Sequence, residues 1–368
     1  MAFSHSPRPE ANVRLDLEVK ADRSESSFEG AKVLLPYRQS SLGSAAMMIT
    51  RRGVVAGLSA SGAFPHVARA AWPERPITML HGFAPGGGAD ANARIAAEGL
   101  GRVLGQTVIV ESKTGAGTTL ASAQLVRAVP DGYTIALIAT SYCASAAFYK
   151  NLPYRPIEDI SAIGQLSEAP YVIVTYAEHP ARSLPQMLDM ARKQGGSISY
   201  GTPGVGSGNH LATELLAQRA GVKLTHVPFR GGAQAVVEVL GQRIDFMIDP
   251  PLSMIEHLKS GKFRALAVST TTRFPGLPDI PTVQELGISN FDLTAWFALV
   301  APAATPNPVV QRLNAATGEV LAAPAARDRL LALGAVPKAS SPKELADLIA
   351  ADIKRWTEVV DKAGIERI

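Results

Sequence analysis

Residues 77–90 read ITMLHGFAPGGGAD and join an apolar run to a helical pattern through three consecutive glycines. The run predicts a strand over Ile77–Phe83, and the apolar spacing after the glycines predicts a helix over Ala89–Leu104. A strand that enters a helix through a glycine-rich turn is typical of α/β proteins with largely parallel sheets. In such sheets, ligands bind at the carboxyl ends of the strands.

The same alternation of strands and helices continues to the end of the chain. Further strands are predicted over Val108–Glu111, Thr134–Ala139, Tyr171–Tyr176, Ile198–Tyr200, Leu224–Val227, Asp245–Ile248, Ala265–Ser269 and Thr294–Val300. Further helices are predicted over Ser183–Lys193, Asn209–Ala220, Gln234–Leu240, Pro308–Leu321 and Pro342–Ala363. The chain is also long enough for two domains of ordinary size, since it has 368 residues.

Two long apolar strands, Tyr171–Tyr176 and Thr294–Val300, lack the usual flanking turn glycines. Between them lies an α/β segment of about 120 residues, so both strands are candidates for crossovers between domains. The sequence therefore predicts a discontinuous first domain, residues 71–172 plus 298–368, and a second domain, residues 173–297. A hinge of two strands would let such domains close a cleft on a ligand.

The glycine-rich loop before the first helix is a candidate anion site. Glycines let backbone N–H groups approach a ligand, and the helix start adds unpaired N–H groups and partial positive charge. Asp90 can cap the helix or accept a hydrogen bond from a ligand, and a tight turn with an ordinary cap is the structural alternative. The candidate ligand-binding residues of this loop are Phe83, Pro85, Gly86, Gly87, Gly88 and Asp90.

A second loop of the same kind, YGTPGVGSGNHL over residues 200–211, opens a helix in the other predicted domain. Two such helix starts facing each other across a cleft could hold two carboxylates, or one carboxylate and a polar group. Its candidate ligand-binding residues are Gly201, Thr202, Gly204, Gly206, Ser207 and His210.

Three further polar residues follow predicted strands and are weaker candidates, since each also has an ordinary structural explanation. Thr140 and Ser141 end one strand and offer hydroxyls, while Asp249 precedes Pro250 and could accept from a ligand hydroxyl or amine. His210 and Glu214 share a helix face but no third metal ligand is evident, so we expect no metal site.

The remaining motifs and the charge argue against several other classes of protein. No catalytic elbow, zinc-protease or P-loop motif occurs, and the glycine patterns depart from the dinucleotide fingerprint, so we expect neither an enzyme nor a cofactor. Residues 1–70 hold nine Lys or Arg and six Asp or Glu; the remainder holds 27 and 26. The body is thus nearly neutral, and nucleic-acid binding is not expected. Cys143, the single cysteine, excludes an internal disulfide.

The N-terminal region has the layout of an export signal. Arg51 and Arg52 precede a mildly apolar run, and Ala68–Ala70 offers small residues for cleavage after Ala70. Residues 47–70 therefore predict a twin-arginine-like signal, and residues 1–46 a disordered or non-native extension upstream of Met47. A membrane anchor is the alternative, but the run is shorter than the ~20 apolar residues of a span.

Several segments, in this order, resemble the Bug family, the substrate-binding proteins of tripartite tricarboxylate transporters. They are Pro85–Asp90, Glu111–Gly117, Ala128–Tyr133, Tyr200–Ala212, His226–Gly231, Gly261–Val268, Leu277–Thr282 and Ala301–Pro306. The resemblance implies a periplasmic-binding-protein-like Venus flytrap of two α/β domains joined by a two-strand hinge. It also implies carboxylate binding through backbone N–H groups and ordered water.

The resulting hypothesis is a periplasmic, monomeric protein that delivers a small carboxylate or dicarboxylate to integral-membrane permease subunits. A sensor that presents the bound ligand to a membrane kinase uses the same clamshell and is the alternative. An exported enzyme that acts on carboxylic acids is a third hypothesis. The identity of the ligand cannot be inferred from the sequence.

Overall fold

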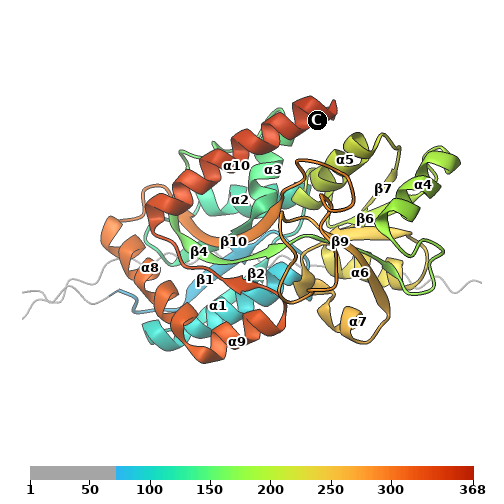
Figure 1. The fold of residues 1–368 in the computed structure, drawn as a ribbon. Coiled ribbons are helices and arrows are strands. Elements are labelled where there is room, and N and C mark those ends of the chain that lie inside the picture. The colour runs from blue at the N-terminus through green and yellow to red at the C-terminus, as the bar shows by residue number, and fades with distance from the viewer. Residues whose placement is uncertain (1–71) are drawn as a thin grey trace, which may run out of the picture. The chain divides into compact units, whose positions relative to one another are not determined.

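The computed structural model describes residues 72–368, all of which lie in one compact unit. The predicted extension and export signal lie outside the described residues. Within residues 72–368, no helix is long and apolar enough to cross a membrane. Two β-sheets divide this part of the chain into a first half and a second half, each with its own helices (Figure 1).

The sheet of the first half has six strands in the order β11-β4-β10-β3-β1-β2. β1 runs parallel to β2 and β3, whereas β10 is antiparallel to β3 and β4, and β11 to β4. The strand bounds are β1 Ile77–His81, β2 Val108–Ser112, β3 Thr134–Ala139, β4 Ile160–Pro170, β10 Thr294–Pro302 and β11 Val336–Pro337.

Alternate residues of these strands point to opposite faces, and helices bury both faces. Met79 of β1 packs into a core that also holds side chains of α1, α8 and α9, while Leu80 packs with α2, α3 and α10. Figure 1 shows these two layers on either side of the sheet. The helices are α1 Gly88–Leu104, α2 Thr119–Val126, α3 Thr140–Phe148, α8 Asn307–Ala322, α9 Pro324–Ala332 and α10 Pro342–Ala363, with a 3-10 turn at Ala116–Thr118.

The sheet of the second half has five strands in the order β7-β6-β8-β5-β9. β6 is parallel to β7 and β8, and β5 is antiparallel to β8 and β9. The strands are β5 Val172–Tyr176, β6 Ser199–Thr202, β7 Thr225–Pro228, β8 Phe246–Asp249 and β9 Phe263–Val268. The helices are α4 Leu184–Gln194, α5 Gly208–Ala220, α6 Gly232–Leu240 and α7 Ile255–Lys259, with a 3-10 turn at Pro251–Ser253.

The chain passes between the halves twice. It leaves β4 at Pro170 and enters β5 at Val172, and it returns through residues 269–293. The two passages are hydrogen-bonded to each other, because Ser269 N–H donates to the Tyr171 carbonyl (3.0 Å) and Tyr171 N–H donates to Ser269 Oγ (2.9 Å).

The predicted crossover strands need two adjustments. β4 is a long strand that the apolar pattern did not indicate, and the crossing lies at its junction with β5. β10 pairs with β4 from Thr294 onward, so Thr294–Phe297 lie in the first sheet although the predicted second domain extends to residue 297.

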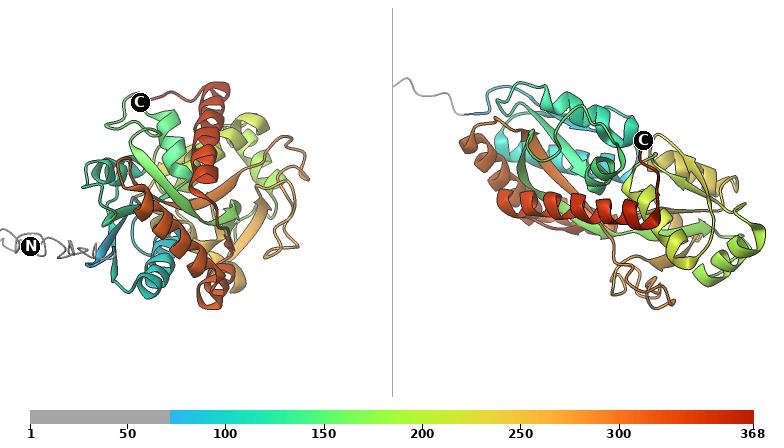
Figure 2. Two further views of the ribbon diagram at one scale, coloured as in Figure 1. Left: turned by 90° about the vertical axis from the view of Figure 1, so that its left-hand side faces the viewer. Right: turned by 90° about the horizontal axis from the view of Figure 1, so that it is seen from above.

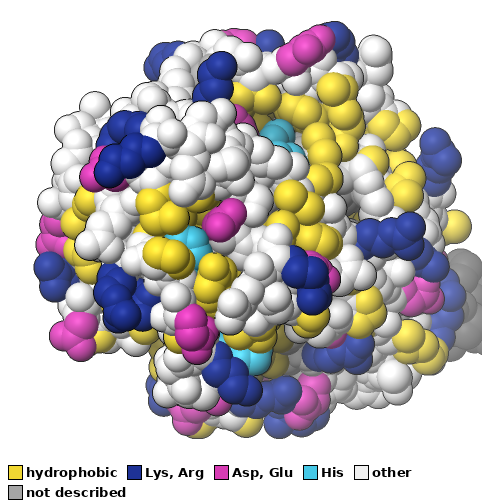
Figure 3. Space-filling model, turned by 90° about the vertical axis from the view of Figure 1, so that its right-hand side faces the viewer, with side chains coloured by type: hydrophobic (Ala, Val, Ile, Leu, Met, Phe, Trp, Pro, Cys, Tyr) yellow, Lys and Arg dark blue, Asp and Glu magenta, His cyan; other side chains and the backbone are white. Residues whose placement is uncertain are grey.

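The long C-terminal helix α10 connects the two halves along one side. Seen from above in Figure 2, it runs over the first half and ends near the second. There the side-chain amide of Gln218, in α5, donates to the backbone carbonyl of Lys362. On the face shown in Figure 3, positive and negative side chains are interspersed, so this face carries no large field of one sign.

Candidate functional site

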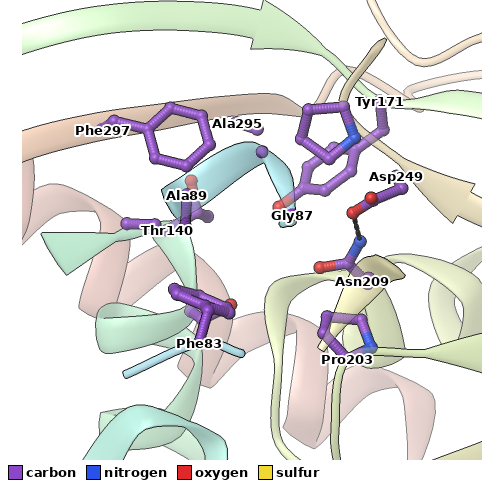
Figure 4. A pocket seen from close by; sticks show the side chains of 15 residues that line it. Phe83, Gly87, Ala89, Thr140, Tyr171, Pro203, Asn209, Asp249, Ala295 and Phe297 are labelled. Atoms are coloured by element: carbon purple, nitrogen blue, oxygen red, sulfur yellow. Dashed lines mark hydrogen bonds between the residues drawn. The ribbon is translucent and has the colours of Figure 1, made fainter. Parts of the chain in front are cut away.

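A cavity with about 470 Å³ of atom-free space lies where the carboxyl ends of strands from both sheets meet (Figure 4). The lining residues are Phe83, Gly87, Gly88, Ala89, Ala139, Thr140, Ser141, Tyr171, Pro203, Asn209, Gly232, Asp249, Pro250, Ala295 and Phe297.

Four helices begin at this cavity, two from each half. Gly88 begins α1 and Thr140 begins α3 in the first half, whereas Asn209 lies in the first turn of α5 and Gly232 begins α6 in the second. No lysine or arginine is among the lining residues. Attraction of an anion to this cavity therefore has to come from helix dipoles and unpaired backbone N–H groups.

Three of these four helix starts carry no side-chain cap. The residues that precede α1, α3 and α6 are Gly87, Ala139 and Gly231, and none accepts a hydrogen bond through its side chain. Only α5 is capped, by Ser207 Oγ, which accepts from His210 N–H at 3.2 Å. The first-turn N–H groups of the other three helices thus have no local side-chain acceptor, which leaves them available to a ligand.

At two of these helix starts, a polar side chain lies so close to a glycine that a Cβ atom there would clash with it. A Cβ atom at Gly208 would lie 2.6 Å from the hydroxyl of Tyr171, and one at Gly232 would lie 2.7 Å from Oδ2 of Asp249. Both distances are shorter than real Cβ contacts, so the absence of a side chain at Gly208 and Gly232 allows α5 and α6 to begin beside these polar groups.

Only some of the predicted ligand-binding residues in the first loop line the cavity. Phe83, Gly87 and Gly88 line the cavity, whereas Pro85 and Gly86 are exposed. Asp90 is buried but outside the lining, and its Oδ2 accepts from Gly86 N–H (3.0 Å) and Arg94 Nε (2.9 Å).

This arrangement corresponds to the structural alternative for Asp90. Burial opposes ionisation, but the hydrogen bonds from Arg94 and Gly86 outweigh it and lower the pKa of the carboxyl group. His81 Nε2 lies 3.3 Å from the other carboxylate oxygen of Asp90. Asp90 therefore holds the glycine turn in place instead of facing the cavity.

The weaker candidates Thr140, Ser141 and Asp249 all line the cavity. Thr140 begins α3, and its hydroxyl oxygen accepts from Trp296 N–H at 2.9 Å. Ser141 Oγ accepts from Gly208 N–H at 3.2 Å and so links α3 of the first half to α5 of the second.

Asp249 is the only carboxyl group among the residues that line this cavity. Burial raises its pKa to about 6, although hydrogen bonds from Ser253 and Asn209 act in the opposite direction. Asn209 Nδ2 donates to Asp249 Oδ1 at 2.6 Å, and Ser253 Oγ donates to Oδ2.

The second predicted loop lies mainly beside a neighbouring cavity. Gly204 and Ser207 line this neighbour, and Phe83 and Pro203 line both cavities. Gly201, Thr202 and Gly206 line neither cavity; Thr202 Oγ1 lies 2.7 Å from His226 Nε2, and Gly206 has a left-handed φ of 74°.

His210 lines neither cavity and packs between the halves, with its ring edge-on to Phe148 of α3 in the first half at a centroid distance of 5.8 Å. Its ring stacks on His226 with centroids 4.1 Å apart, and its Nδ1 accepts from Gly206 N–H at 3.3 Å. Burial lowers the pKa of His210 to about 4. Within residues 72–368, no three His, Cys, Asp or Glu side chains lie close enough to hold a metal ion.

Sequence reasoning missed several lining residues. Asn209 lies inside the second glycine-rich loop, two residues after the helix cap Ser207, and its position in the first turn of the helix was the available signal. Gly231 and Gly232 repeat the strand, glycine and helix pattern after β7, which could have identified the start of α6. Tyr171 and Phe297 gave no local signal, because only the crossing of the chain brings them to the cavity.

Comparisons with known proteins agree with this architecture. Residues 92–365 match the family described as "Tripartite tricarboxylate transporter family receptor". The structure of the periplasmic binding protein BugD is 35% identical, has a TM-score of 0.78, and matches 81% of this chain and 100% of its own.

Two solved structures from Rhodopseudomonas palustris are also similar. MatC with bound malate is 32% identical, with a TM-score of 0.76, and covers 78% of this chain and 100% of its own. Rpa4515 with adipate is 29% identical, with a TM-score of 0.78, and covers 81% and 100%. These likenesses confirm the predicted fold class, a periplasmic-binding-protein-like α/β fold.

Proposed function

The chain belongs to the tripartite tricarboxylate transporter receptors, and from this premise we propose that it captures a small carboxylate and delivers it to membrane permease subunits. The Bug-family resemblance is confirmed, and the family consists of periplasmic substrate-binding receptors. We propose the periplasm as the location of this chain, with export directed by residues 47–70 and cleavage after Ala70.

The convergence of four helix starts on one cavity is the observation that carries this proposal. Each half supplies two of them, and no basic side chain lines the cavity. A carboxylate between these helix starts would accept hydrogen bonds from backbone N–H groups and gain from the dipoles. The malate and adipate in the two similar structures support a small dicarboxylate as the ligand.

We assign the contacts to the ligand by position in the cavity. Gly87 and Gly88 would offer N–H groups from α1, and Thr140 and Ser141 would do so from α3. Phe83 would form an apolar wall, since it separates the main cavity from its neighbour. The neighbouring loop, with Gly204 and Ser207, would position the start of α5 or extend the site for a longer ligand. We do not assign a ligand contact to Asp90 or His210.

We further propose that the two halves act as domains that close on the ligand. The passages at Tyr171 and at residues 269–293 are the only covalent connections between the two sheets within residues 72–368. A ligand that bonds to helix starts of both halves binds the closed form better than the open form. It therefore shifts the equilibrium toward closure by that difference in affinity.

The test is binding and closure with a panel of carboxylates, using protein that begins at Ala71. Thermal unfolding would detect stabilisation by a bound acid, and small-angle X-ray scattering would detect a smaller radius of gyration. We expect at least one dicarboxylate to give both effects. Failure of every acid in a broad panel to give either effect would refute a carboxylate receptor.

A pair of variants separates occupancy of the cavity from general effects on the fold. Ala295 is buried and lines the cavity, so Ala295→Leu places three extra carbon atoms in the space for the ligand. Ala304 is exposed, so Ala304→Leu adds the same atoms outside the site. We expect only Ala295→Leu to abolish stabilisation by the acid.

Delivery to a permease is tested in cells. A deletion strain should fail to take up the radiolabelled acid identified in the panel, and the wild-type gene should restore uptake, whereas Ala295→Leu should not. A sensor predicts a different result: constitutive expression of the permease would restore uptake without the binding protein.

A further inference from the structure

Asn209 carries a polar group whose orientation the structure determines. Its side-chain nitrogen Nδ2 donates to the Ile248 carbonyl at 2.7 Å and to Asp249 Oδ1 at 2.6 Å. An amide nitrogen has two hydrogens, so these two bonds use both. A flipped amide would place its oxygen against two acceptor oxygens, and Oδ1 is therefore the atom turned away from Asp249.

The oxygen of this amide is directed into the ligand cavity. Figure 4 shows the nitrogen of Asn209 toward Asp249 and its oxygen on the opposite side, toward the space between Phe83 and Thr140. Asn209 is only 5% exposed and lines the cavity. The hydrogen bonds of this side chain within residues 72–368 all use Nδ2, and Oδ1 is not among the buried atoms that lack a partner, so it is an acceptor that is accessible from the cavity and open to a ligand.

This acceptor differs in kind from the helix starts around it, which offer donors. A carboxylate oxygen placed against Asn209 Oδ1 would bring two acceptors together, and an apolar carbon there would leave a buried acceptor unpaired. A ligand hydroxyl or ammonium group would satisfy it. The carboxyl group of Asp249, which accepts from the amide nitrogen, adds negative potential and so also favours a donor group of the ligand at this position.

We propose that Asn209 is a specificity-determining residue that accepts a hydrogen bond from the ligand, and that the preferred ligand is a carboxylate with a hydroxyl or ammonium substituent. This inference rests on the proposed function, since it concerns the same cavity. It narrows the ligand class from any small carboxylate to hydroxy acids and amino acids, because a site that is built to hydrogen-bond a substituent rejects the analogue that lacks it.

The test compares acids that share a carbon chain and differ only in the donor. Isothermal titration calorimetry would measure succinate against 2-hydroxysuccinate and 2-aminosuccinate, and glutarate against 2-hydroxyglutarate and 2-aminoglutarate. We expect a donor-bearing acid to bind about tenfold more tightly than its unsubstituted parent. A stronger effect of the hydroxyl identifies a hydroxy-acid site, and a stronger effect of the ammonium group an amino-acid site.

Variants of Asn209 connect the preference to this residue. Asn209→Leu removes the acceptor at similar volume, and we expect the ratio between each substituted acid and its parent to fall to about one. Asn209→Ser is the second variant if the first unfolds, because its hydroxyl can still donate to Ile248 or Asp249. We expect the shorter side chain to lose the preference as well. Thermal unfolding without ligand would show which variants fold.

The two proposals fail in different ways. If the unsubstituted acids bind wild-type protein as tightly as the substituted ones, or if Asn209→Leu and Asn209→Ser retain the preference, the role of Asn209 is overturned while the carboxylate receptor stands. If none of a broad set of carboxylates binds, the receptor proposal and this inference both fall.

Discussion

Lowering the pH from about 7.5 to about 4.5 is expected to destabilise the protein through the stacked imidazoles of His210 and His226. Burial lowers the pKa of His210 to about 4, and burial together with the neighbouring His210 lowers that of His226 to about 3. Both rings are thus neutral in the folded state at a pH where the unfolded chain binds protons. Protonation of His210 at Nδ1 would also break the bond from Gly206 N–H.

The sign and size of the effect follow from linkage. For His210, the folded pKa of about 4 lies below the usual 6.5, so its stability contribution is complete above pH 6.5 and decreases as the pH falls toward 4. Between about pH 7.5 and about pH 4.5 this one group costs about 2.5 kcal/mol. Asp249 acts oppositely. Its pKa rises from 3.8 to about 6, so it favours the folded state by about 2 kcal/mol at the lower pH.

Two variants should therefore shift the pH dependence in opposite directions. His210→Asn cannot take a charge, and its amide oxygen can replace Nδ1 as the acceptor for Gly206, so the acid loss should shrink by about 2.5 kcal/mol. Asp249→Asn removes the opposing group, so the loss should grow by about 2 kcal/mol. Urea unfolding of ligand-free protein, followed by circular dichroism at both pH values, measures each difference.

The comparison within each variant removes the cost of the substitution itself. His210→Asn is expected to be less stable than wild type at about pH 7.5, because it loses the ring stack with His226. Only its change between the two pH values bears on the titration. An acid loss in His210→Asn equal to that of wild type would refute the argument that this imidazole is held neutral by burial.

Two further predictions use glycines whose surroundings differ. Gly318→Ala should raise the free energy of unfolding by up to about 1 kcal/mol, because nothing lies within 4 Å of the Cβ position at Gly318 in α8. Gly99→Ala should lower it, because the new Cβ would lie 2.4 Å from Val320 Cγ1. Thermal unfolding of both variants measures the two effects. Gly208→Ala should weaken acid binding at least several-fold in calorimetry, because the added carbon displaces the hydroxyl of Tyr171; unchanged affinity would contradict the tight approach of α5.

The apolar pattern predicted those elements whose burial follows one local period. β3 lies at the predicted bounds, and α10 likewise, because its buried residues recur at helical spacing. β4 was missed because Gln165 and Ser167 interrupt its apolar run, although both are buried. Tertiary contacts hold this part of β4: Ser167 Oγ donates to Asn92 Oδ1 at 2.8 Å, and the backbone N–H of Gln165 donates to Ser340 Oγ at 3.0 Å. Such partners lie too far along the chain for a local pattern to indicate.

The residues of the site also fall into those that the local sequence could predict and those that depend on the tertiary fold. The glycine-rich helix starts were predictable because the strand, turn and helix are contiguous in sequence. The orientation of Asp90 was also encoded locally, since Arg94 lies one helical turn later and pairs with it. Tyr171 and the orientation of Asn209 were not, because each depends on strands that only the folded topology brings together.

The distribution of polar groups in the cavity separates affinity from selectivity. Helix starts present backbone donors that any carboxylate can use, so they favour the class of ligand without distinguishing its members. Asn209 presents the opposite group, an acceptor, and its partner must be supplied by the ligand. The helix starts are shared equally between the halves, so a carboxylate gains its full set of bonds only when both halves contact it. In the proposed binding mode, charge recognition favours closure, and the acceptor determines which closed complexes are free of an unpaired buried group.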